Sequence, residues 1–194
     1  MKKDRITLAI YSGNIPSTTF IENLIEGMAE SGMNIVLFGK MNRPVSYAGN
    51  VRIIPTPQNT PELTVFVLKE SMKLIMRDRR KFARLYSSVK KRTGSSRQFL
   101  RDMGAILPII NEDPGIFHVQ WAKTVQVYPE LFEHLTGKIA VSLRGAHINY
   151  SPLNDPSLAD AYRKYFPGVS AFHAVSQAIM LEAAKYGADP EKTT

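Results

Sequence analysis

The sequence contains no cysteine at all. Disulfide-stapled folds, thiolate metal centres and cysteine nucleophiles are therefore excluded, and the composition fits a reducing cytoplasm. No apolar run approaches the roughly 20 residues that a membrane-spanning helix needs. The run near the N-terminus covers residues 6–11 and is shorter than the apolar region of a secretory signal, which is about 7–15 residues long. We therefore expect a cytoplasmic protein.

Several nucleotide-binding and catalytic motifs are also missing. The loop after the first apolar run has neither the G-x-G-x-x-G pattern of dinucleotide-binding folds nor the G-x-x-x-x-G-K-[ST] pattern of P-loops. No G-x-S-x-G elbow occurs. The four histidines lack the H-x-x-x-H spacing of a zinc site, and they are His118, His134, His147 and His173. We expect neither a nicotinamide cofactor nor a metal ion.

What the sequence does contain is an alternation of short apolar runs and helical patterns. Of its 194 residues, 44% are hydrophobic, which is enough for one sizeable core. Six runs are typical of buried strands: 6–11, 34–39, 51–54, 115–121, 138–144 and 169–175. Helices are predicted between and after them, at 17–31, 62–91, 97–110, 125–135, 157–165 and 177–186. This alternation predicts an α/β fold with a doubly wound, mainly parallel, Rossmann-like sheet of about six or seven strands in one domain.

Ligands of open parallel sheets bind beyond the carboxyl ends of the strands. Arg144 ends an otherwise apolar strand, where its guanidinium could hold a sugar hydroxyl, a carboxylate or a phosphate, or could form a structural salt bridge. His147 follows in a polar loop and could be a general acid, a substrate ligand or a surface residue. His118 and His173 lie inside apolar strands and are expected to be hydrogen-bonded core residues. Further candidates at strand ends are Gly13, Asn14, Gln120, Trp121, Gly145 and Ser176.

Four motifs occur in an order that is typical of one enzyme family. They read Ser12-Gly13-Asn14-Ile15-Pro16, Gly115-Ile116-Phe117-His118-Val119-Gln120, Val141 to Asn149, and Phe172 to Ser176 followed by Tyr186 to Lys192. Together they resemble the N-terminal domain of the group 1 (family 4) retaining glycosyltransferases, which have the two-domain GT-B architecture. The resemblance covers essentially the whole chain.

The chain departs from the pattern of that family at four positions. Gly115 and Gln120 replace the first Asp and second His of its Asp-x-x-His-x-His strand. In its His-Gly-x-Asp motif, Arg144 stands where His is usual and His147 stands where Asp is usual. Since some polysaccharide-type members carry Arg-Gly in place of His-Gly, the resemblance still holds.

The resemblance implies that residues 1–194 are the acceptor-binding half of a bacterial-type glycosyltransferase, inactive alone, whose C-terminal nucleotide-sugar-binding domain lies outside this chain. Such an enzyme transfers a sugar from a nucleotide-diphosphate sugar to a glycan or lipid-linked acceptor with retention, as in polysaccharide biosynthesis, without a metal or other cofactor. The expected catalytic residues, near the sugar, are Arg144 and His147. The residues expected near the donor phosphates are Gly13, Asn14 and Gly145. The residues expected to bind substrate are Gln120, Trp121, Asn149 and Ser176.

Positive charge is concentrated in one segment. Residues 69–101 hold twelve Lys and Arg and two acidic residues. The net charge of this segment, +10, exceeds the net charge of +8 for the whole chain. Five of these cations are predicted on one face of a long helix: Lys69, Lys73, Arg77, Arg80 and Arg84. A basic amphipathic surface suits a peripheral enzyme that works at the anionic inner leaflet of the cell membrane.

Other readings of the sequence stay open. The basic segment could be a solvated face, or it could bind phosphates in a nucleic-acid-binding module. We expect no nucleic-acid partner, because no DNA- or RNA-binding motif occurs and aromatic residues do not interleave the basic run. A nucleotide-sugar epimerase of GT-B shape is a further alternative to a transferase.

Overall fold

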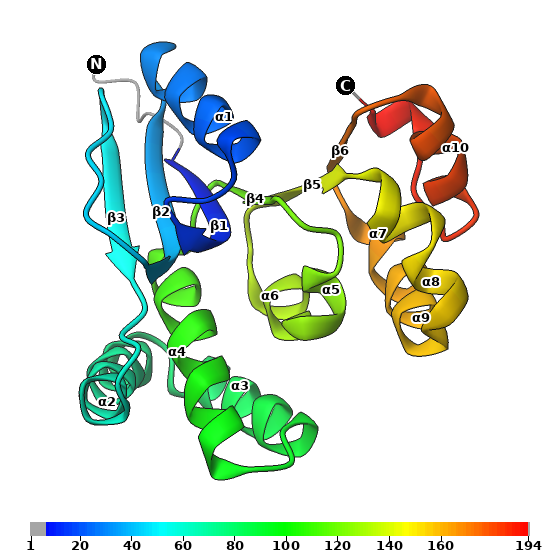
Figure 1. Cartoon of the computed structure of the whole chain (residues 1–194). Coiled ribbons are helices and arrows are strands. Elements are labelled where there is room, and N and C mark those ends of the chain that lie inside the picture. The colour runs from blue at the N-terminus through cyan, green and yellow to red at the C-terminus, as the bar shows by residue number, and fades with distance from the viewer. Residues whose placement is uncertain (1–6, 194) are drawn as a thin grey trace.

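The computed structural model describes residues 7–193, which form a six-stranded, all-parallel sheet covered by helices (Figure 1). The strands are β1 (Thr7–Ile15), β2 (Asn34–Met41), β3 (Val51–Pro55), β4 (Ile116–Val119), β5 (Lys138–Leu143) and β6 (Ala171–Ala174). Their order across the sheet is β3-β2-β1-β4-β5-β6. The predicted doubly wound α/β fold is confirmed. Ile6, the expected start of the first strand, lies outside the described residues.

Helices of two size classes connect the strands. The longer ones are α1 (Thr19–Glu30), α2 (Thr60–Arg77), α3 (Arg79–Arg92), α4 (Ser96–Glu112), α9 (Pro156–Tyr165) and α10 (Gln177–Ala184). The shorter ones are α5 (Thr124–Val127), α6 (Pro129–His134), α7 (Gly145–Asn149) and α8 (Ser151–Asn154), with 3-10 turns η1 (Phe166–Gly168) and η2 (Pro190–Lys192). Within residues 7–193, none of these helices has the length and apolar content required to span a bilayer.

Alternate side chains of the strands enter two separate cores. Leu8 and Ile10 of β1 pack with Ile21 and Ile25 of α1 in the smaller core. Ala9 of β1 points to the opposite face and joins the larger core, to which α2, α3, α4 and α9 contribute. In Figure 1, α1 lies on one side of the sheet, and α2, α3 and α4 lie on the other. Because neighbouring side chains point to opposite faces, strands covered on both sides read as continuous apolar runs.

The expected single helix over 62–91 is wrong, because the chain forms two helices that meet at Asp78. Asp78 has an extended backbone (φ −154°, ψ 91°), and its side chain accepts a hydrogen bond from the Lys81 N–H at 2.8 Å. This cap ends α2 and starts α3 in a new direction. The helical pattern over 62–91 predicts one apolar face that includes Leu68, Met72, Leu85 and Val89, and this prediction is wrong on α2, where Leu68 and Met72 are 65% and 57% exposed. It holds on α3, where Leu85 and Val89 are buried.

Three smaller predictions also differ from the structure. β1 continues through Gly13 to Ile15, because a bulge after Tyr11 lets Gly13 adopt φ +81° and pair with Gly39 of β2. The expected helix over 125–135 is two short helices, with Pro129 at the start of the second. The expected polar loop after β5 contains the short helices α7 and α8, so His147 lies on a helix.

The sheet order has a functional consequence. The chain winds outward from β1 to β3 and then returns to place β4 on the other side of β1. The reversal creates a switch point between β1 and β4, and in doubly wound folds ligands bind at the carboxyl ends of the strands there. Residues that follow β1, β4 and β5 are thus the first place to look for a site.

Candidate functional site

Four of the predicted site residues meet at the carboxyl ends of β4 and β5. Gln120 directly follows β4, and Arg144 directly follows β5. The Arg144 Nη2 donates a hydrogen bond to Gln120 Oε1 at 3.1 Å. The Trp121 ring lies 5.1 Å from the Arg144 guanidinium carbon and 5.3 Å from the His147 ring, measured to ring centroids. With Phe20, we call these residues the Arg144 cluster.

Phe20, in the first turn of α1, completes the cluster and was missed by the sequence analysis. Its ring lies 4.2 Å from the Arg144 guanidinium carbon, so the cation is close to two aromatic faces. Such contacts hold a guanidinium in place. The buried face of α1 is formed by Ile21, Ile25 and Ala29, whereas Phe20 is 47% exposed. The sequence does carry a signal for Phe20, because it is an aromatic residue outside the i, i+4, i+8 spacing of the buried face of α1.

Buried polar atoms of the Arg144 cluster have no hydrogen-bond partner within the described chain. They are Gln120 Nε2, Arg144 Nε and His147 Nδ1. Gln120 is fully buried, and an unpaired buried donor costs about 1–3 kcal/mol. Nearly all buried polar groups in folded proteins are paired, so unpaired ones call for a ligand or water. The cluster thus holds three polar atoms whose hydrogen bonds are left for a ligand or water.

Burial also sets the protonation state of the cluster. It lowers the pKa of Arg144, which remains cationic because an arginine starts from a very high value. Burial, with the nearby charges of Lys123 and Arg144, lowers the pKa of His147 below its usual 6.5. His147 is therefore neutral at pH 7, with one ring nitrogen able to donate and the other able to accept. A neutral imidazole suits a hydrogen bond to a sugar hydroxyl.

A row of polar side chains crosses the sheet on β4, β5 and β6. His118 Nε2 lies 3.0 Å from Ser142 Oγ, which in turn lies 3.5 Å from His173 Nδ1. His118 is buried, and that burial lowers its pKa to about 4. The prediction that both histidines are hydrogen-bonded structural residues agrees with this geometry for His118, whereas His173 is partly exposed.

The remaining predicted residues lie near this edge but outside the Arg144 cluster. Within residues 7–193, no hydrogen bond joins Asn14, Asn149 or Ser176 to it. Ser176 instead caps α10, accepting from the Ile179 N–H at 3.3 Å. Gly145 follows Arg144 as the first residue of α7. Across the described residues, no three His, Asp or Glu side chains gather as a metal site would need.

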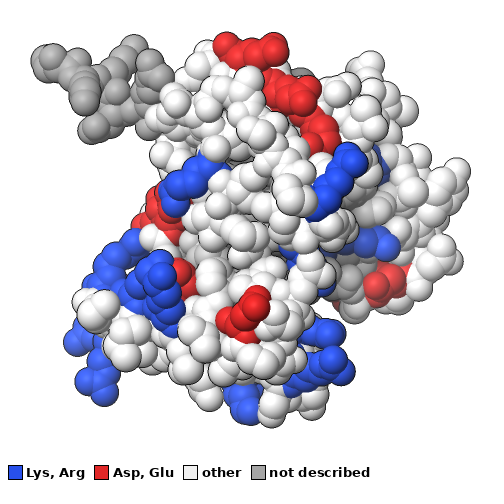
Figure 2. Space-filling model, turned by 60° about the vertical axis from the view of Figure 1, so that its left-hand side comes forward, with Lys and Arg blue, Asp and Glu red and all other residues white. Residues whose placement is uncertain are grey.

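The five predicted basic residues do not share one helix face. Lys69, Lys73 and Arg77 lie on α2, whereas Arg80 and Arg84 lie on α3. Two of them are paired: Lys73 with Glu70, and Arg77 with Asp113 at 3.1 Å. The other three form no salt bridge with any described residue. Figure 2 shows most Lys and Arg side chains over the lower part of the molecule, whereas acidic side chains lie along the top and also among the basic ones lower down.

The fold is that of one half of a GT-B glycosyltransferase. Sucrose-phosphate synthase from Thermosynechococcus elongatus aligns with a TM-score of 0.56 and 12% identity over 97% of this chain and 86% of that chain. The lipopolysaccharide outer core galactosyltransferase WaaB aligns with a TM-score of 0.51 and 9% identity over 97% of this chain and 44% of that one. The α,α-trehalose 6-phosphate synthase from Burkholderia multivorans aligns with a TM-score of 0.53 and 10% identity over 93% of this chain and 42% of that chain.

These similarities are in structure and not in sequence. No protein-family profile matches the chain, and no curated protein matches it by sequence. The chain spans less than half the length of the WaaB and trehalose 6-phosphate synthase chains. At identities of 9–12% these alignments establish the fold alone, and function has to be argued from the site itself.

Proposed function

We propose that this chain is the acceptor-side half of a retaining glycosyltransferase that moves a sugar from a nucleotide-diphosphate sugar to a glycan or lipid-linked acceptor. The observation that carries the proposal is the Arg144 cluster, in which unpaired donors and two aromatic faces meet at the switch-point edge of the sheet. Aromatic faces and amide or guanidinium donors are a combination that suits sugar rings. The structural neighbours are transferases, which favours transfer over epimerisation.

In the proposed reaction, the bond between the sugar carbon and the leaving diphosphate breaks, the acceptor oxygen bonds to that carbon, and the proton of the acceptor hydroxyl passes to the leaving diphosphate oxygen. Charge builds up as an oxocarbenium-like sugar and an anionic diphosphate. Arg144 is placed to hold sugar or phosphate oxygens, with Gln120 fixing one of its nitrogens. Neutral His147 hydrogen-bonds a sugar hydroxyl, and Trp121 packs on a sugar face. These groups act by positioning and by charge stabilisation.

The donor nucleotide is proposed to bind mainly to a second domain outside these 194 residues. Support comes from the coverage of WaaB and trehalose 6-phosphate synthase, of which this fold accounts for 44% and 42%. From this half, the backbone near Gly13 and Asn14 and at Gly145 would approach the donor phosphates. Asn149 and Ser176 would line the outer part of the acceptor path.

We further propose that α2 and α3 contact the anionic inner leaflet. Lys69, Arg80 and Arg84 are exposed and have no salt bridge with any described residue. On α2, which carries Lys69, the apolar side chains of Leu68, Met72 and Met76 are 57–75% exposed. Exposed apolar and basic side chains together favour an interfacial membrane contact, which suits a lipid-linked acceptor.

Trp121 gives a direct test, because it is the single tryptophan of the chain. We expect its fluorescence to change when nucleotide-diphosphate sugars or oligosaccharides are titrated into the protein. The Arg144→Gln variant should lose that fluorescence response. The control variant Lys91→Gln, which changes an exposed residue of α3 outside the Arg144 cluster, should keep it. If no ligand changes the fluorescence up to about 10 mM, which corresponds to roughly 3 kcal/mol of binding free energy, the proposed site is wrong.

A further inference from the structure

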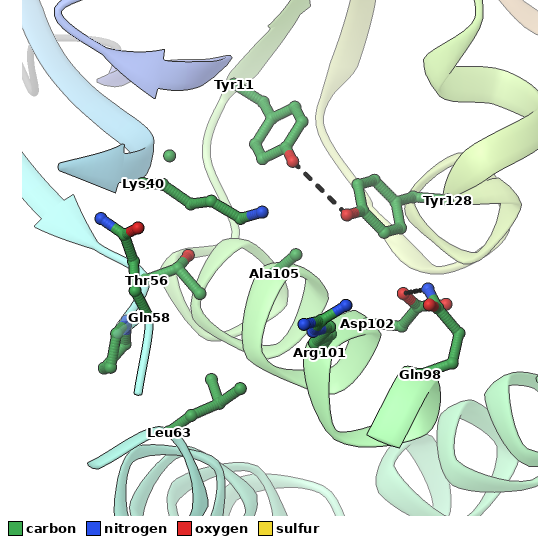
Figure 3. Close-up of a pocket in the computed structure, with 12 residues that line it drawn as sticks. Tyr11, Lys40, Thr56, Gln58, Leu63, Gln98, Arg101, Asp102, Ala105 and Tyr128 are labelled. Carbon is green, nitrogen blue, oxygen red and sulfur yellow. Dashed lines mark hydrogen bonds between the residues drawn. The ribbon is translucent and has the colours of Figure 1, made fainter. Parts of the chain in front are cut away.

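A cavity separate from the Arg144 cluster shares no lining residue with it. Its volume is about 340 Å³, and it opens between the carboxyl ends of β1 and β2, the segment after β3, and helix α4 (Figure 3). Tyr11 comes from β1, Lys40 from the end of β2, Thr56 from just after β3, and Arg101 from α4. The volume lies within the range of small-molecule sites, about 300–1,000 Å³.

Two cations reach this cavity without a partner. Among the described residues, neither the Lys40 nor the Arg101 side chain has a hydrogen bond or an ion pair. They come from different elements, β2 and α4, and Figure 3 shows both side chains extending toward the same space. Two like charges held over one cavity repel each other and attract an anion. The cavity therefore has a positive end.

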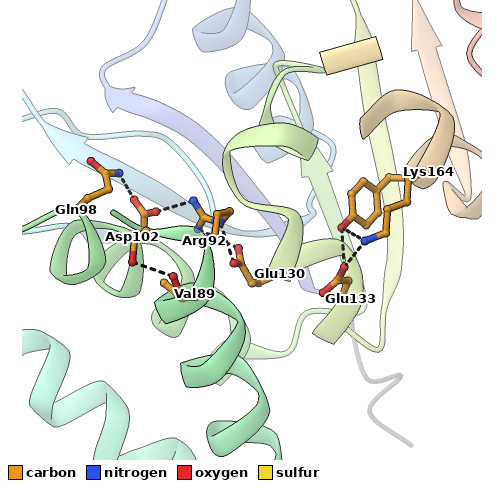
Figure 4. Close-up of polar contacts among 9 residues, drawn as sticks. Val89, Arg92, Gln98, Asp102, Glu130, Glu133 and Lys164 are labelled. Carbon is orange, nitrogen blue, oxygen red and sulfur yellow. Dashed lines mark hydrogen bonds and ion pairs between the residues drawn. The ribbon is translucent and has the colours of Figure 1, made fainter. Parts of the chain in front are cut away.

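The carboxylate in the wall does not cancel this charge. Asp102 is 1% exposed, accepts a hydrogen bond from Gln98, and forms an ion pair with Arg92 at 2.8 Å (Figure 4). Burial raises the pKa of Asp102, while the Arg92 guanidinium opposes that shift and offsets the charge of the carboxylate. Arg92 also bonds Glu130 at 2.9 Å, so these groups are occupied with one another. The charges left for a ligand are those of Lys40 and Arg101.

The rest of the wall is suited to hydroxyl groups. The Tyr11 and Tyr128 hydroxyl oxygens are 3.5 Å apart, at the edge of hydrogen-bonding distance, and their rings meet edge to face at 5.6 Å. Burial raises the pKa of both tyrosines, so each keeps its hydroxyl proton. Thr56 and Gln58 add a hydroxyl and an amide. Such groups donate to and accept from sugar hydroxyls.

We propose that this cavity binds a phosphorylated sugar, with the phosphate monoester between Lys40 and Arg101 and the sugar hydroxyls against Tyr11, Tyr128 and Thr56. The two negative charges of a phosphate monoester balance the two positive charges of Lys40 and Arg101, whereas a carboxylate carries only one negative charge. This inference rests on the proposed function, for which it names a class of acceptor.

The test is calorimetric titration of the chain with glucose 6-phosphate, fructose 6-phosphate, glucose, glucuronate and inorganic phosphate. We expect a hexose phosphate to bind at least tenfold more tightly than the other three. Lys40→Gln and Arg101→Gln should each weaken that binding about tenfold, as the loss of a charged hydrogen bond does. The matched exposed variants Lys91→Gln and Arg97→Gln should leave it unchanged, and all four should keep the melting temperature of the wild type.

Several results would overturn the proposal: no binding of either hexose phosphate, equal binding of glucose or glucuronate, equal binding of inorganic phosphate, or unaltered affinity in both cavity variants. Displacement of the hexose phosphate by anionic phospholipid vesicles would assign the site to a lipid headgroup and would also contradict it. Trp121 does not line this cavity, so its fluorescence reports on the Arg144 cluster separately. The hexose phosphate proposal can therefore be contradicted while the proposed transferase site at the Arg144 cluster stands. The proposal for the Arg144 cluster can likewise be contradicted while hexose phosphate binding in the cavity is observed.

Discussion

Arg144 is held by three neighbours, and this defines what it can do. Phe20 and Trp121 flank its guanidinium, and Gln120 accepts from one nitrogen, while Nε stays unpaired. The structural salt bridge considered as an alternative is absent, since no carboxylate among the described residues pairs with Arg144. A cation that is fixed by its surroundings but not neutralised is well placed to act on a ligand.

Replacing Arg144 should therefore cost more activity than stability. In the proposed full-length transferase we expect Arg144→Ala to lower kcat by roughly 10²–10³-fold, as the loss of one preorganised donor does. The Arg144→Lys variant should retain only part of the wild-type activity, because a lysine lacks the planar guanidinium with its paired N–H donors. Steady-state kinetics and thermal melts on the same samples give both readings. Parallel losses of activity and melting temperature would contradict the binding role.

His118 should make stability depend on pH. Its pKa is about 4 in the folded protein against an ordinary 6.5, so the folded state resists protonation. The stabilisation by neutral His118 is complete above pH 6.5 and is lost as the pH falls toward 4, by about 3 kcal/mol in total. Urea unfolding at pH 7 and pH 4 should show a smaller acid loss for His118→Gln than for the wild type. Equal losses in the two proteins would contradict the assignment.

Residues that follow β4 and β5 could be predicted from the sequence, whereas Lys40 at the end of β2 and Arg101 on α4 could not. Gln120, Trp121 and Arg144 follow directly from the strand pattern, because parallel strands bring their carboxyl ends to one edge. Lys40 and Arg101 gave no such signal, since an exposed cation looks the same in sequence whether it faces water or a cavity. Only the packing of α4 against the sheet brings Arg101 and Lys40 to the same space.

At the scale of elements, Arg92 holds three helices together. It ends α3 and bonds Asp102 of α4 and Glu130 of α6, two carboxylates that are 1% and 0% exposed (Figure 4). Arg92→Met should lower the free energy of unfolding by about 3–5 kcal/mol, because it leaves buried carboxylates uncompensated. Urea denaturation measures this, with the exposed Arg97→Met as a control expected within about 0.5 kcal/mol of wild type. A loss below about 1 kcal/mol would show that the network is not important for stability.

The break at Asp78 shows why the basic segment was misread. Its helical pattern continues through the sequence, and no proline or glycine marks the boundary between α2 and α3. The side chain of Asp78 ends one helix and caps the next. Sequence periodicity therefore predicted the helical content correctly but not the direction of either helix face. The five basic residues predicted on one face are divided between α2 and α3.

At the scale of the whole molecule, the charge distribution makes membrane binding testable. Each basic residue near an anionic leaflet contributes about 1 kcal/mol, so Lys69, Arg80 and Arg84 together should retain the protein on vesicles. We expect sedimentation with anionic but not neutral vesicles, weakened by salt. The triple variant Lys69→Glu, Arg80→Glu, Arg84→Glu should stay in solution. If it pellets like the wild type, the basic surface is a solvated face.

The order of elements was the most predictable feature of the molecule. Six apolar runs separated by helical patterns lead to the doubly wound sheet, and four motifs in sequence pointed to the GT-B half that the structural neighbours share. The identity of the sugar and of the acceptor depends on side-chain geometry at the rims of two sites, which no periodic pattern encodes.

The most direct test of the proposed transferase is an assay of sugar transfer by the full-length gene product. Nucleotide-diphosphate sugars would be offered with hexose phosphates and lipid-linked acceptors, and the product anomer read by NMR. We predict transfer with retention by the full-length protein, its loss in Arg144→Ala, and no turnover by the 194-residue chain alone. Turnover by this chain alone at enzymatic rates, or epimerisation of the donor without transfer, would contradict the account.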